Sequence, residues 1–329
     1  MKTLETLCDG MISGREAIRN AFRWDSEQFY PVCANLFLIN GTEPDGEKLR
    51  ACLAMVKDRT NVFSDFRGNA RLPVICLLSL EEDPEKRLEK VLSAHKALRS
   101  RFMASDYLAL AAWTLSDLDE DSLDQTADRA RALYGRMRKE HPLLTGSEDT
   151  VFTALLALSD RDDDALIRDT EASYALLKTR FLSGDSMQTV SHILALDPRS
   201  PGEKTAKLTE LYDAVVQNGI KYGRTRELAL LAPLALTDAD PGVIAREMLT
   251  VYDRLEGVKG WNGIFGYDCR QRAMHAAMLV SDLHDPAAGR ANMMIAQQTT
   301  LNAVIAQQMA VCAAVTASAA ASSAASSSH

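Results

Sequence analysis

The amino-acid sequence predicts an all-α protein: an α-solenoid-like array of about six helical hairpin repeats that can curl toward an α/α toroid. Three observations predict this fold. Hydrophobic residues make up 47% of the 329 residues and aromatic residues only 6%, and the abundance of Ala and Leu favours helix. No convincing run of residues alternates between apolar and polar as a strand does. A short phrase, an apolar helix ending followed by an acidic turn, recurs along the chain, as internal repeats do.

The recurring phrase sets the length of the repeat. It occurs as CLLSLEEDP, AAWTLSDLDED, ALLALSDRDDD, HILALDP, PLALTDADP and AMLVSDLHDP, with equivalent positions at Leu80, Leu115, Leu158, Leu196, Leu236 and Val280. These positions are 35, 43, 38, 40 and 44 residues apart, so the period is near 40 residues, about two helices and two turns. One such hairpin cannot bury its apolar face alone, and neighbouring hairpins are therefore expected to stack.

The turns between hairpins carry helix-start signals. Four of them contain Asp-Pro, at Asp83-Pro84, Asp197-Pro198, Asp240-Pro241 and Asp285-Pro286. An Asp side chain caps a helix start, and Pro is favoured at the first helical position. Amphipathic helices are expected over 84–102 and 243–255. Asn218-Gly219 is expected to end the helix over 203–217.

The array is expected to occupy residues 49–286, with other segments on either side. Residues 1–48 are predicted to form helices that pack on the array, one of them opened by the capping-box match Ser13-x-x-Glu16. Residues 287–315 predict an Ala-rich helix, and residues 316–329 are a low-complexity Ala/Ser tail.

Charge and cysteine content exclude several classes of function. The chain has 37 Lys and Arg against 45 Asp and Glu, a net charge of −8, which argues against broad nucleic-acid binding. It has no stretch of about 20 apolar residues, so no membrane span is expected. The first residues, MKTLETLCDGMISG, lack the apolar core of a secretory signal, and the six scattered cysteines indicate reduced thiols. A cytoplasmic location is predicted.

Two phrases resemble a known family. They are NVFSDFRGNARLPVICLLSLEEDPEK at 61–86 and GWNGIFGYDCRQRAMHAAMLVSDL at 260–283. Together with the Ala/Ser-rich end, they are similar to an uncharacterised bacterial family catalogued as domain of unknown function 4003. The likeness covers nearly the whole chain. It implies a cytosolic bacterial protein of unassigned activity, and it supplies no catalytic residues.

Arginines precede the inner helix in the first, fifth and sixth repeats, whereas the other three carry acidic residues there. The arginines are Arg67, Arg71, Arg224, Arg226, Arg270 and Arg272, and the acidic residues are Asp106, Glu148, Asp149 and Asp185. A helix N-terminus is partly positive, so arginine there is unfavourable by up to about 1 kcal/mol. Either a neighbouring carboxylate, such as Asp65, Glu227 or Asp268, or a bound phosphate or carboxylate is expected to offset this cost.

Aromatic residues occupy the same loops as the arginines. They either plug the gaps between helix ends or form the apolar wall of a ligand site. His275 lies one turn past Arg272 and could reach such a site. The predicted ligand-binding residues are therefore Phe66, Arg67, Arg71, Tyr222, Arg224, Arg226, Trp261, Tyr267, Arg270, Arg272 and His275.

Two acidic turns approach the spacing of a calcium-binding loop. They are the turn at Asp117, Asp119, Asp121 and Asp128 and the turn at Asp160, Asp162, Asp164 and Glu171. Both lack the glycine that such a loop needs, with Ser122 and Ala165 in its place. Helix capping is the favoured interpretation, and no metal, cofactor or catalytic residue is predicted.

Two functions are compatible with these features. The first is a binding or scaffold protein whose concave surface takes a protein or peptide partner, since nothing in the sequence demands chemistry. The alternative is an enzyme or small-molecule sensor that binds an anionic ligand in an arginine-lined cavity. A further hypothesis assigns self-association to the Ala-rich C-terminal helix.

Overall fold

The computed structural model describes residues 3–23, 27–262 and 266–284. Within these residues the regular elements are all helices, which confirms the all-α prediction. The odd-numbered α-helices are α1 (Leu4–Ala21), α3 (Gly46–Arg59), α5 (Pro84–Arg99), α7 (Glu120–Glu140), α9 (Asp163–Lys178), α11 (Pro201–Gln217) and α13 (Pro241–Glu256). The even-numbered ones are α2 (Phe29–Ile39), α4 (Arg71–Leu80), α6 (Asp106–Leu115), α8 (Asp149–Leu158), α10 (Gly184–Leu194), α12 (Leu231–Leu236) and α14 (Cys269–His284). Two short 3-10 helices, η1 (Asp65–Arg67) and η2 (Arg226–Leu230), precede α4 and α12.

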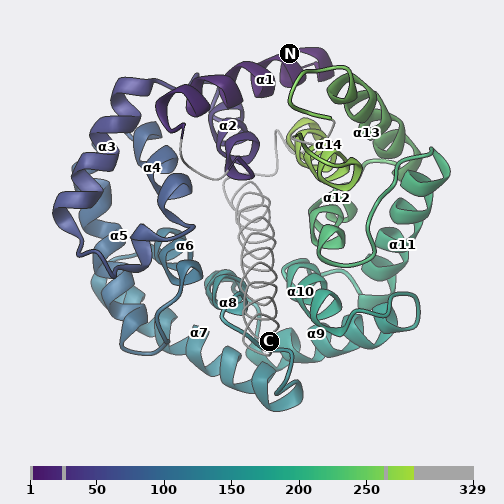
Figure 1. Ribbon diagram of the computed structural model, residues 1–329. Helices are drawn as coiled ribbons and strands as arrows, with labels where there is room; N and C mark the ends of the chain where they lie inside the picture. Colours follow the sequence, from purple (N-terminus) through teal and green to yellow (C-terminus); the bar gives the residue numbers. More distant parts are fainter. Residues whose placement is uncertain (1–2, 24–26, 263–265, 285–329) are drawn as a thin grey trace, which may run out of the picture.

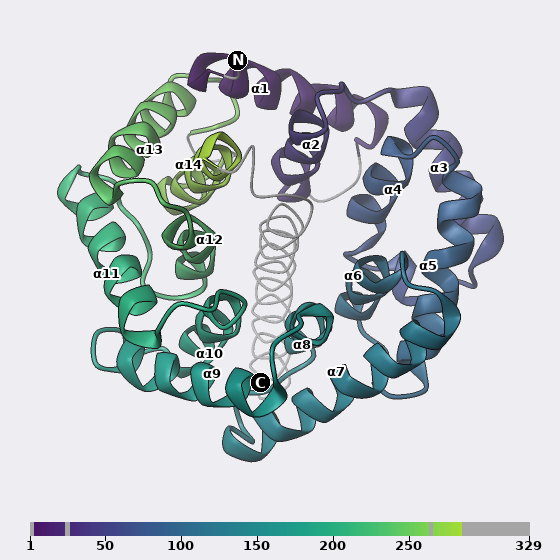
Figure 2. The ribbon, with the colours of Figure 1, turned by 180° about the vertical axis from the view of Figure 1, so that it is seen from behind.

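The helices form a closed ring of two layers (Figures 1 and 2). Odd-numbered helices make the outer layer and even-numbered helices the inner layer. The ring closes because α1 packs against both α13 and α14, and α14 also contacts α2. The N-terminal helices α1 and α2 thus take an outer and an inner place like the later pairs. The predicted helix at 287–315, the tail at 316–329 and the turn at Asp285-Pro286 lie outside the described residues.

The composition of each helix explains its layer. Inner helices are apolar on all sides; every residue of α6 after Asp106 is buried. Outer helices are amphipathic, and α5 buries only Leu88, Val91, Ala94 and Leu98 along one face. A helix that is hydrophobic all round must be covered on every side, whereas an amphipathic helix can face water. The outer helices and the neighbouring inner helices provide that cover.

Most of the predicted helix starts are observed. Four Asp side chains each accept a hydrogen bond from the backbone N–H three residues later, namely Asp83, Asp119, Asp162 and Asp240. The helix α11 differs, because it begins at Pro201 with Ser200 as its cap and Glu203 completing a capping box. The prediction that Asp197-Pro198 starts this helix is therefore wrong. Gly219 follows α11 with a φ of 88°, a backbone conformation that favours glycine.

The N-terminal helix begins earlier than the sequence pattern indicates. Its cap is Thr3, which forms a reciprocal capping box with Thr6. Ser13 lies inside α1 and donates to the carbonyl of Gly10 instead, so the Ser13-x-x-Glu16 capping-box prediction is wrong. A Ser hydroxyl within a helix can bond a backbone carbonyl of the preceding turn as easily as it caps a helix start.

Basic side chains bind the carbonyls that end the inner helices. The last carbonyls of a helix have no partner within it and carry partial negative charge, so basic side chains stabilise them. The donors come from the outer helix that precedes the inner helix, or from the turn just before that outer helix. The pairs include Lys48 with the carbonyl of Glu81, Arg129 with Ala157 and Ser159, Arg161 with Ala195 and Asp197, and Arg199 with Leu236.

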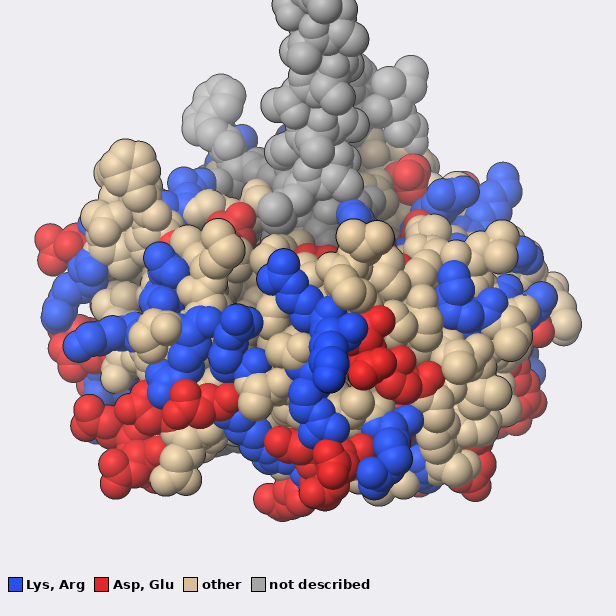
Figure 3. Space-filling model, turned by 90° about the horizontal axis from the view of Figure 1, so that it is seen from below, with Lys and Arg blue, Asp and Glu red and all other residues tan. Residues whose placement is uncertain are grey.

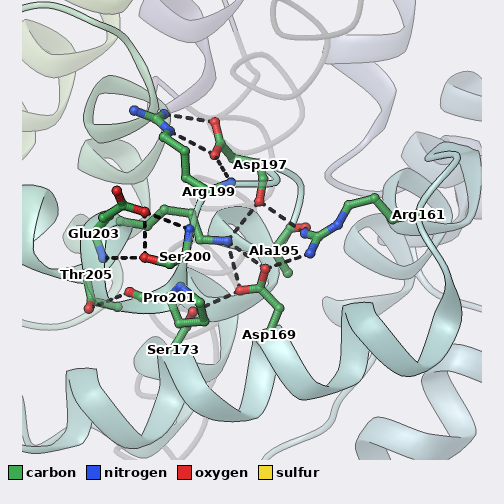
Figure 4. A network of polar contacts seen from close by, with 11 residues as sticks. Arg161, Asp169, Ser173, Ala195, Asp197, Arg199, Ser200, Pro201, Glu203 and Thr205 are labelled. Carbon is green, nitrogen blue, oxygen red and sulfur yellow. Dashed lines mark hydrogen bonds and ion pairs between the residues drawn. The ribbon is translucent and has the colours of Figure 1, made fainter.

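The most buried of these contacts centres on Lys204 (Figure 4). Its side chain is fully buried, and its Nζ lies 2.8 Å from each carboxylate oxygen of Asp169 and 2.8 Å from the carbonyl of Asp197. Arg161 approaches the same carboxylate at 2.9 Å. Burial lowers the pKa of Lys204, while the hydrogen bond to Asp169 opposes that effect. The network joins α9 and α11 to the turn after α10.

Neighbouring outer helices are linked by ion pairs. In each pair an arginine near the end of one outer helix meets an acidic residue on the next. The pairs are Arg59 with Glu85, Arg101 with Asp128, Arg136 with Asp164, Arg180 with Asp213, and Arg254 with Asp9. The last pair joins α13 to α1 with an Arg–Asp distance of 2.6 Å. The ring is thus closed by the same kind of contact that links its successive outer helices.

Substitution of Asp169 should destabilise the fold strongly. Asp169→Ala leaves the Lys204 ammonium buried without a counter-charge, so we expect unfolding in urea to lose about 3–5 kcal/mol. Asp213→Ala, which removes a half-exposed ion pair with Arg180, is the matched control and should cost at most about 1 kcal/mol. Equal losses in the two variants would contradict a structural role for the buried network.

Candidate functional site

Charged residues at the starts of the inner helices face one another on one side of the ring. Asp106 begins α6, Glu148 precedes α8, Asp185 lies in the first turn of α10, and Arg226 begins η2. These elements adjoin, since α6 packs on α8, α8 on α10, and α10 on η2. We call Asp106, Glu148, Asp149, Asp185 and Arg226 the inner rim.

The electrostatics of the inner rim disfavour ionised carboxylates. Burial raises the pKa of Glu148 to about 7; the charges of Asp149 and Asp185 add to the effect, and Arg226 opposes it. Burial also raises the pKa of Asp185, again opposed by Arg226. The pKa of Asp106 is raised by burial as well, against hydrogen bonds from Asn69. A carboxyl group with a raised pKa does not stabilise the fold when it is ionised, and carboxyl groups with strongly shifted pKa values are typical of functional sites.

Buried polar atoms without partners accompany these carboxylates. Gln188 lies one turn after Asp185 on α10, and its Nε2 donates to Thr145 Oγ1 at 2.7 Å. Its Oε1 is buried and has no hydrogen-bond partner within the described chain. His192, also fully buried, has Nδ1 3.1 Å from Asp149 Oδ1, and its Nε2 likewise lacks a partner among the described residues. An unsatisfied buried acceptor is costly and calls for an explanation.

The first group of predicted residues lies around the end of α3. Arg67 donates to the carbonyls of Lys57 at 2.6 Å and Thr60 at 2.8 Å. It therefore stabilises the last turn of α3, which neither sequence alternative anticipated. Phe66 is buried with its ring 4.9 Å from that of His95, and Arg71 begins α4.

The second group lies before α12. Tyr222 is buried and donates to the carbonyl of Glu227 at 2.8 Å. Arg224 donates from Nε to the Tyr212 hydroxyl at 3.0 Å, and its guanidinium lies 5.8 Å from the centre of that ring. Arg226 differs from both, because its charge acts on two carboxylates of the inner rim, those of Glu148 and Asp185.

The third group forms the seam where the ring closes. The rings of Trp261, Tyr267 and His275 pack against one another at 5.0–5.3 Å between centres. The buried guanidinium of Arg15, from α1, lies 5.8 Å from the Trp261 ring and 5.5 Å from the Tyr267 ring. This packing matches the alternative in which the aromatic residues plug a gap between helices.

The charged members of the third group have partners within the seam or lie outside it. Arg272 contacts Glu256 at 2.8 Å and lies over the Tyr252 ring at 4.9 Å. Burial, and secondarily the charge of Arg15, lowers the pKa of His275 to about 3, so its imidazole is neutral at physiological pH. Arg270 is exposed on the first turn of α14.

The structure thus separates the predicted ligand-binding residues into three places and brings only Arg226 to the inner rim. Ligand binding stays a prediction for all eleven. Glu148 and Asp185 were not predicted as site residues because an acidic residue at a helix start is expected for structural reasons alone. Their recurrence at equivalent positions is visible in the sequence, but only closure of the ring brings the recurring carboxylates together. Gln188, inside α10, has no comparable signal in the sequence.

The described residues contain neither a metal-binding cluster nor a membrane-spanning helix. No group of three or more His, Cys, Asp or Glu side chains there is arranged to hold a metal ion. Asp119 and Asp162, from the two acidic turns, cap helices. No described helix combines the length and apolar character needed to cross a membrane.

Comparison with known proteins identifies relatives without an assigned activity. The family described as "Protein of unknown function (DUF4003)" matches residues 16–310, which confirms the resemblance inferred from 61–86 and 260–283. The chain is also 22% identical over 210 residues to the uncharacterized protein YeaA of Bacillus subtilis (strain 168), covering 61% of this chain and 64% of YeaA. The match therefore spans less than two thirds of that protein. No solved structure matches the chain.

The raised pKa of Glu148 predicts a pH-dependent cost. Between its ordinary pKa of 4.5 and about 7, the folded state keeps a proton that the unfolded state has lost, so stability falls as pH rises through this range. Glu148→Gln removes the cost. Urea unfolding should show the variant similar to the wild type at pH 4 and more stable at pH 8. Glu120→Gln, at an exposed position of α7, is the control, and an equal pH trend in both variants would contradict this prediction.

Proposed function

We propose, from the premise that the chain belongs to the DUF4003 family of proteins of unknown function, that it is a cytosolic helical-repeat binding protein whose ligand site is the inner rim. One observation carries this proposal. Carboxylates whose ionisation is disfavoured adjoin the buried Oε1 of Gln188, which has no hydrogen-bond partner in the described part of the chain. Groups that lower the stability of the fold are expected at sites that serve binding or catalysis.

The chemistry of the inner rim indicates the kind of ligand. It has four carboxyl groups and one guanidinium, that of Arg226, which opposes the raised pKa of Glu148 and Asp185, and the nearby Oε1 of Gln188 has no hydrogen-bond partner among the described residues. A ligand that donates a hydrogen bond to this oxygen and carries positive charge would also relieve the repulsion between the carboxylates. An ammonium or guanidinium group, on a partner protein, a peptide or a small molecule, has these properties.

The alternative, an anionic ligand held by converging arginines, has less support. Arg67 is bonded to carbonyls of α3, Arg224 to Tyr212, and Arg272 to Glu256. Of the predicted arginines, Arg226 alone belongs to the inner rim, where the surrounding charge is negative. A phosphate placed there would meet several carboxylates, which disfavours its binding.

We also propose that the hairpins are copies of one repeating unit, with α1 and α2 as the first. Equivalent ring pairs support this proposal. Each pair joins a residue just past the end of one outer helix to an aromatic residue on the next, and the pairs are Phe102 with Tyr134, His141 with Tyr174, and Phe181 with Tyr212. His95, Tyr134, Tyr174, Tyr212 and Tyr252 follow one another at 39, 40, 38 and 40 residues. The Arg254–Asp9 pair extends the outer ion-pair pattern to α1.

The cytosolic location is supported by the thiols. Cys8, Cys33, Cys52, Cys76 and Cys269 form no disulfide within the described residues, and the first four are buried, as thiols in reduced cytosolic proteins are.

A thermal-shift titration tests the ligand site. The probes are putrescine, a small diamine, and inorganic phosphate. We expect putrescine to raise the melting temperature of the wild type with the logarithm of its concentration. The double variant Glu148→Gln/Asp185→Asn should lose most of that shift, because it removes two of the acceptors.

A matched double variant controls for charge. Glu120→Gln/Asp253→Asn removes two exposed carboxylates of outer helices and should keep the putrescine shift. A phosphate shift that Arg226→Ala abolishes would support the anionic alternative instead. If neither probe shifts the wild type, the inner rim does not bind a ligand of either charge.

A further inference from the structure

Four successive loops each expose one large apolar side chain almost completely. They are Phe63, Met103, Leu143 and Leu182, whose exposed fractions are 94%, 88%, 98% and 91%. In sequence they are 40, 40 and 39 residues apart. We call these four residues the apolar crown.

The apolar crown lies on one side of the ring. Its members follow α3, α5, α7 and α9 by three or four residues. Each of these loops connects an outer helix to the next inner helix, so the four side chains lie on the side where the inner helices begin. This is the side that also carries the inner rim.

Nothing among the described residues explains this exposure structurally. Isolated exposed apolar residues are common on protein surfaces. Here, however, seven large apolar residues are exposed in the described chain, and five of them, the crown and Val62, lie in these loops. A side chain that is nine-tenths exposed contributes almost nothing to the core. Its recurrence in four successive hairpins therefore indicates a surface that is covered by something else.

Basic residues adjoin each of these loops. The last turns of α3, α5, α7 and α9 carry Lys57, Arg59, Lys96, Arg99, Arg138, Lys139 and Lys178. The first turns of the same helices, at their opposite ends, carry acidic residues instead. Figure 3 shows the result from the edge of the ring, with basic side chains prominent toward one side and acidic side chains along the other. The crown thus lies at the basic ends of the outer helices, in the outer layer of the ring, whereas the acidic inner rim on the same side belongs to the inner layer.

We propose that the apolar crown docks this side of the ring peripherally on a bilayer surface that contains anionic lipid. Apolar side chains flanked by Lys and Arg are typical of interfacial membrane binding. The apolar side chains enter the boundary between headgroups and acyl chains, and the basic side chains contact the anionic headgroups. The crown offers separate side chains on separate loops rather than one continuous patch. A protein interface needs a packed, continuous core, whereas a flat bilayer accepts separate insertions.

Vesicle flotation of the full chain tests this proposal. We expect the wild type to float with vesicles of phosphatidylcholine containing phosphatidylglycerol, and to bind less as salt screens the basic residues. Phe63→Ser/Met103→Ser/Leu143→Ser/Leu182→Ser should lower the partition coefficient on the order of a hundredfold, because four apolar side chains no longer leave water. The variant should keep its circular dichroism and melting temperature, since these side chains make almost no contacts.

The control is Leu176→Ser/Val216→Ser, which alters the two exposed apolar residues outside these loops and should bind vesicles like the wild type. The proposal is overturned if the wild type does not float, or if the quadruple variant floats equally well. Sedimentation velocity tests whether a second copy of the chain, rather than a bilayer, covers the apolar crown. Self-association that the quadruple variant abolishes, without vesicle binding, would assign the crown to a contact between copies of the chain.

Discussion

The need to cover the inner helices on every side is the constraint on which this structure depends. An inner helix such as α6 is apolar all round, so its own outer helix cannot bury it and the neighbouring pairs must contribute. An open array would leave the first and last pairs with an uncovered apolar flank, which open repeat proteins protect with special capping units. Closure of α1 against α13 and α14 removes both ends at once.

The closed ring also places the C-terminal ends of all inner helices on one side and their N-terminal ends on the other side. At the C-terminal ends, carbonyls that have no partner within the helix accept hydrogen bonds from basic side chains of the protein, such as Arg129 and Arg161. At the N-terminal ends, the acidic residues that suit each helix separately lie close to one another. Glu148 and Asp185 therefore share a region in which ionisation of each is disfavoured. A locally favourable choice, repeated around a ring, becomes collectively unfavourable.

The seam shows how closure changes the role of residues that resemble a ligand site. Trp261, Tyr267 and His275 combine aromatic and titratable groups, as binding pockets do. In the ring their partner is Arg15, whose guanidinium is buried against two of these rings. Burial of the imidazole then keeps His275 neutral. The inner rim and the apolar crown are the two surfaces that the proposals assign to binding, and both lie on the side where the inner helices begin.

The sequence by itself determined the helical class and several helix ends, because periodicity, Asp caps and glycine act within a few residues of one another. Asp83 and Asp240 cap helices as their positions predict, whereas Ser13 was misassigned because a local pattern cannot tell a helix start from a helix interior. Only the tertiary structure decided which charged residues meet. Arg15 and Trp261 are far apart in the sequence, and Arg226 faces Glu148 from two hairpins away. Such contacts depend on the angle between successive hairpins, which accumulates around the ring and leaves no trace in any short stretch of sequence.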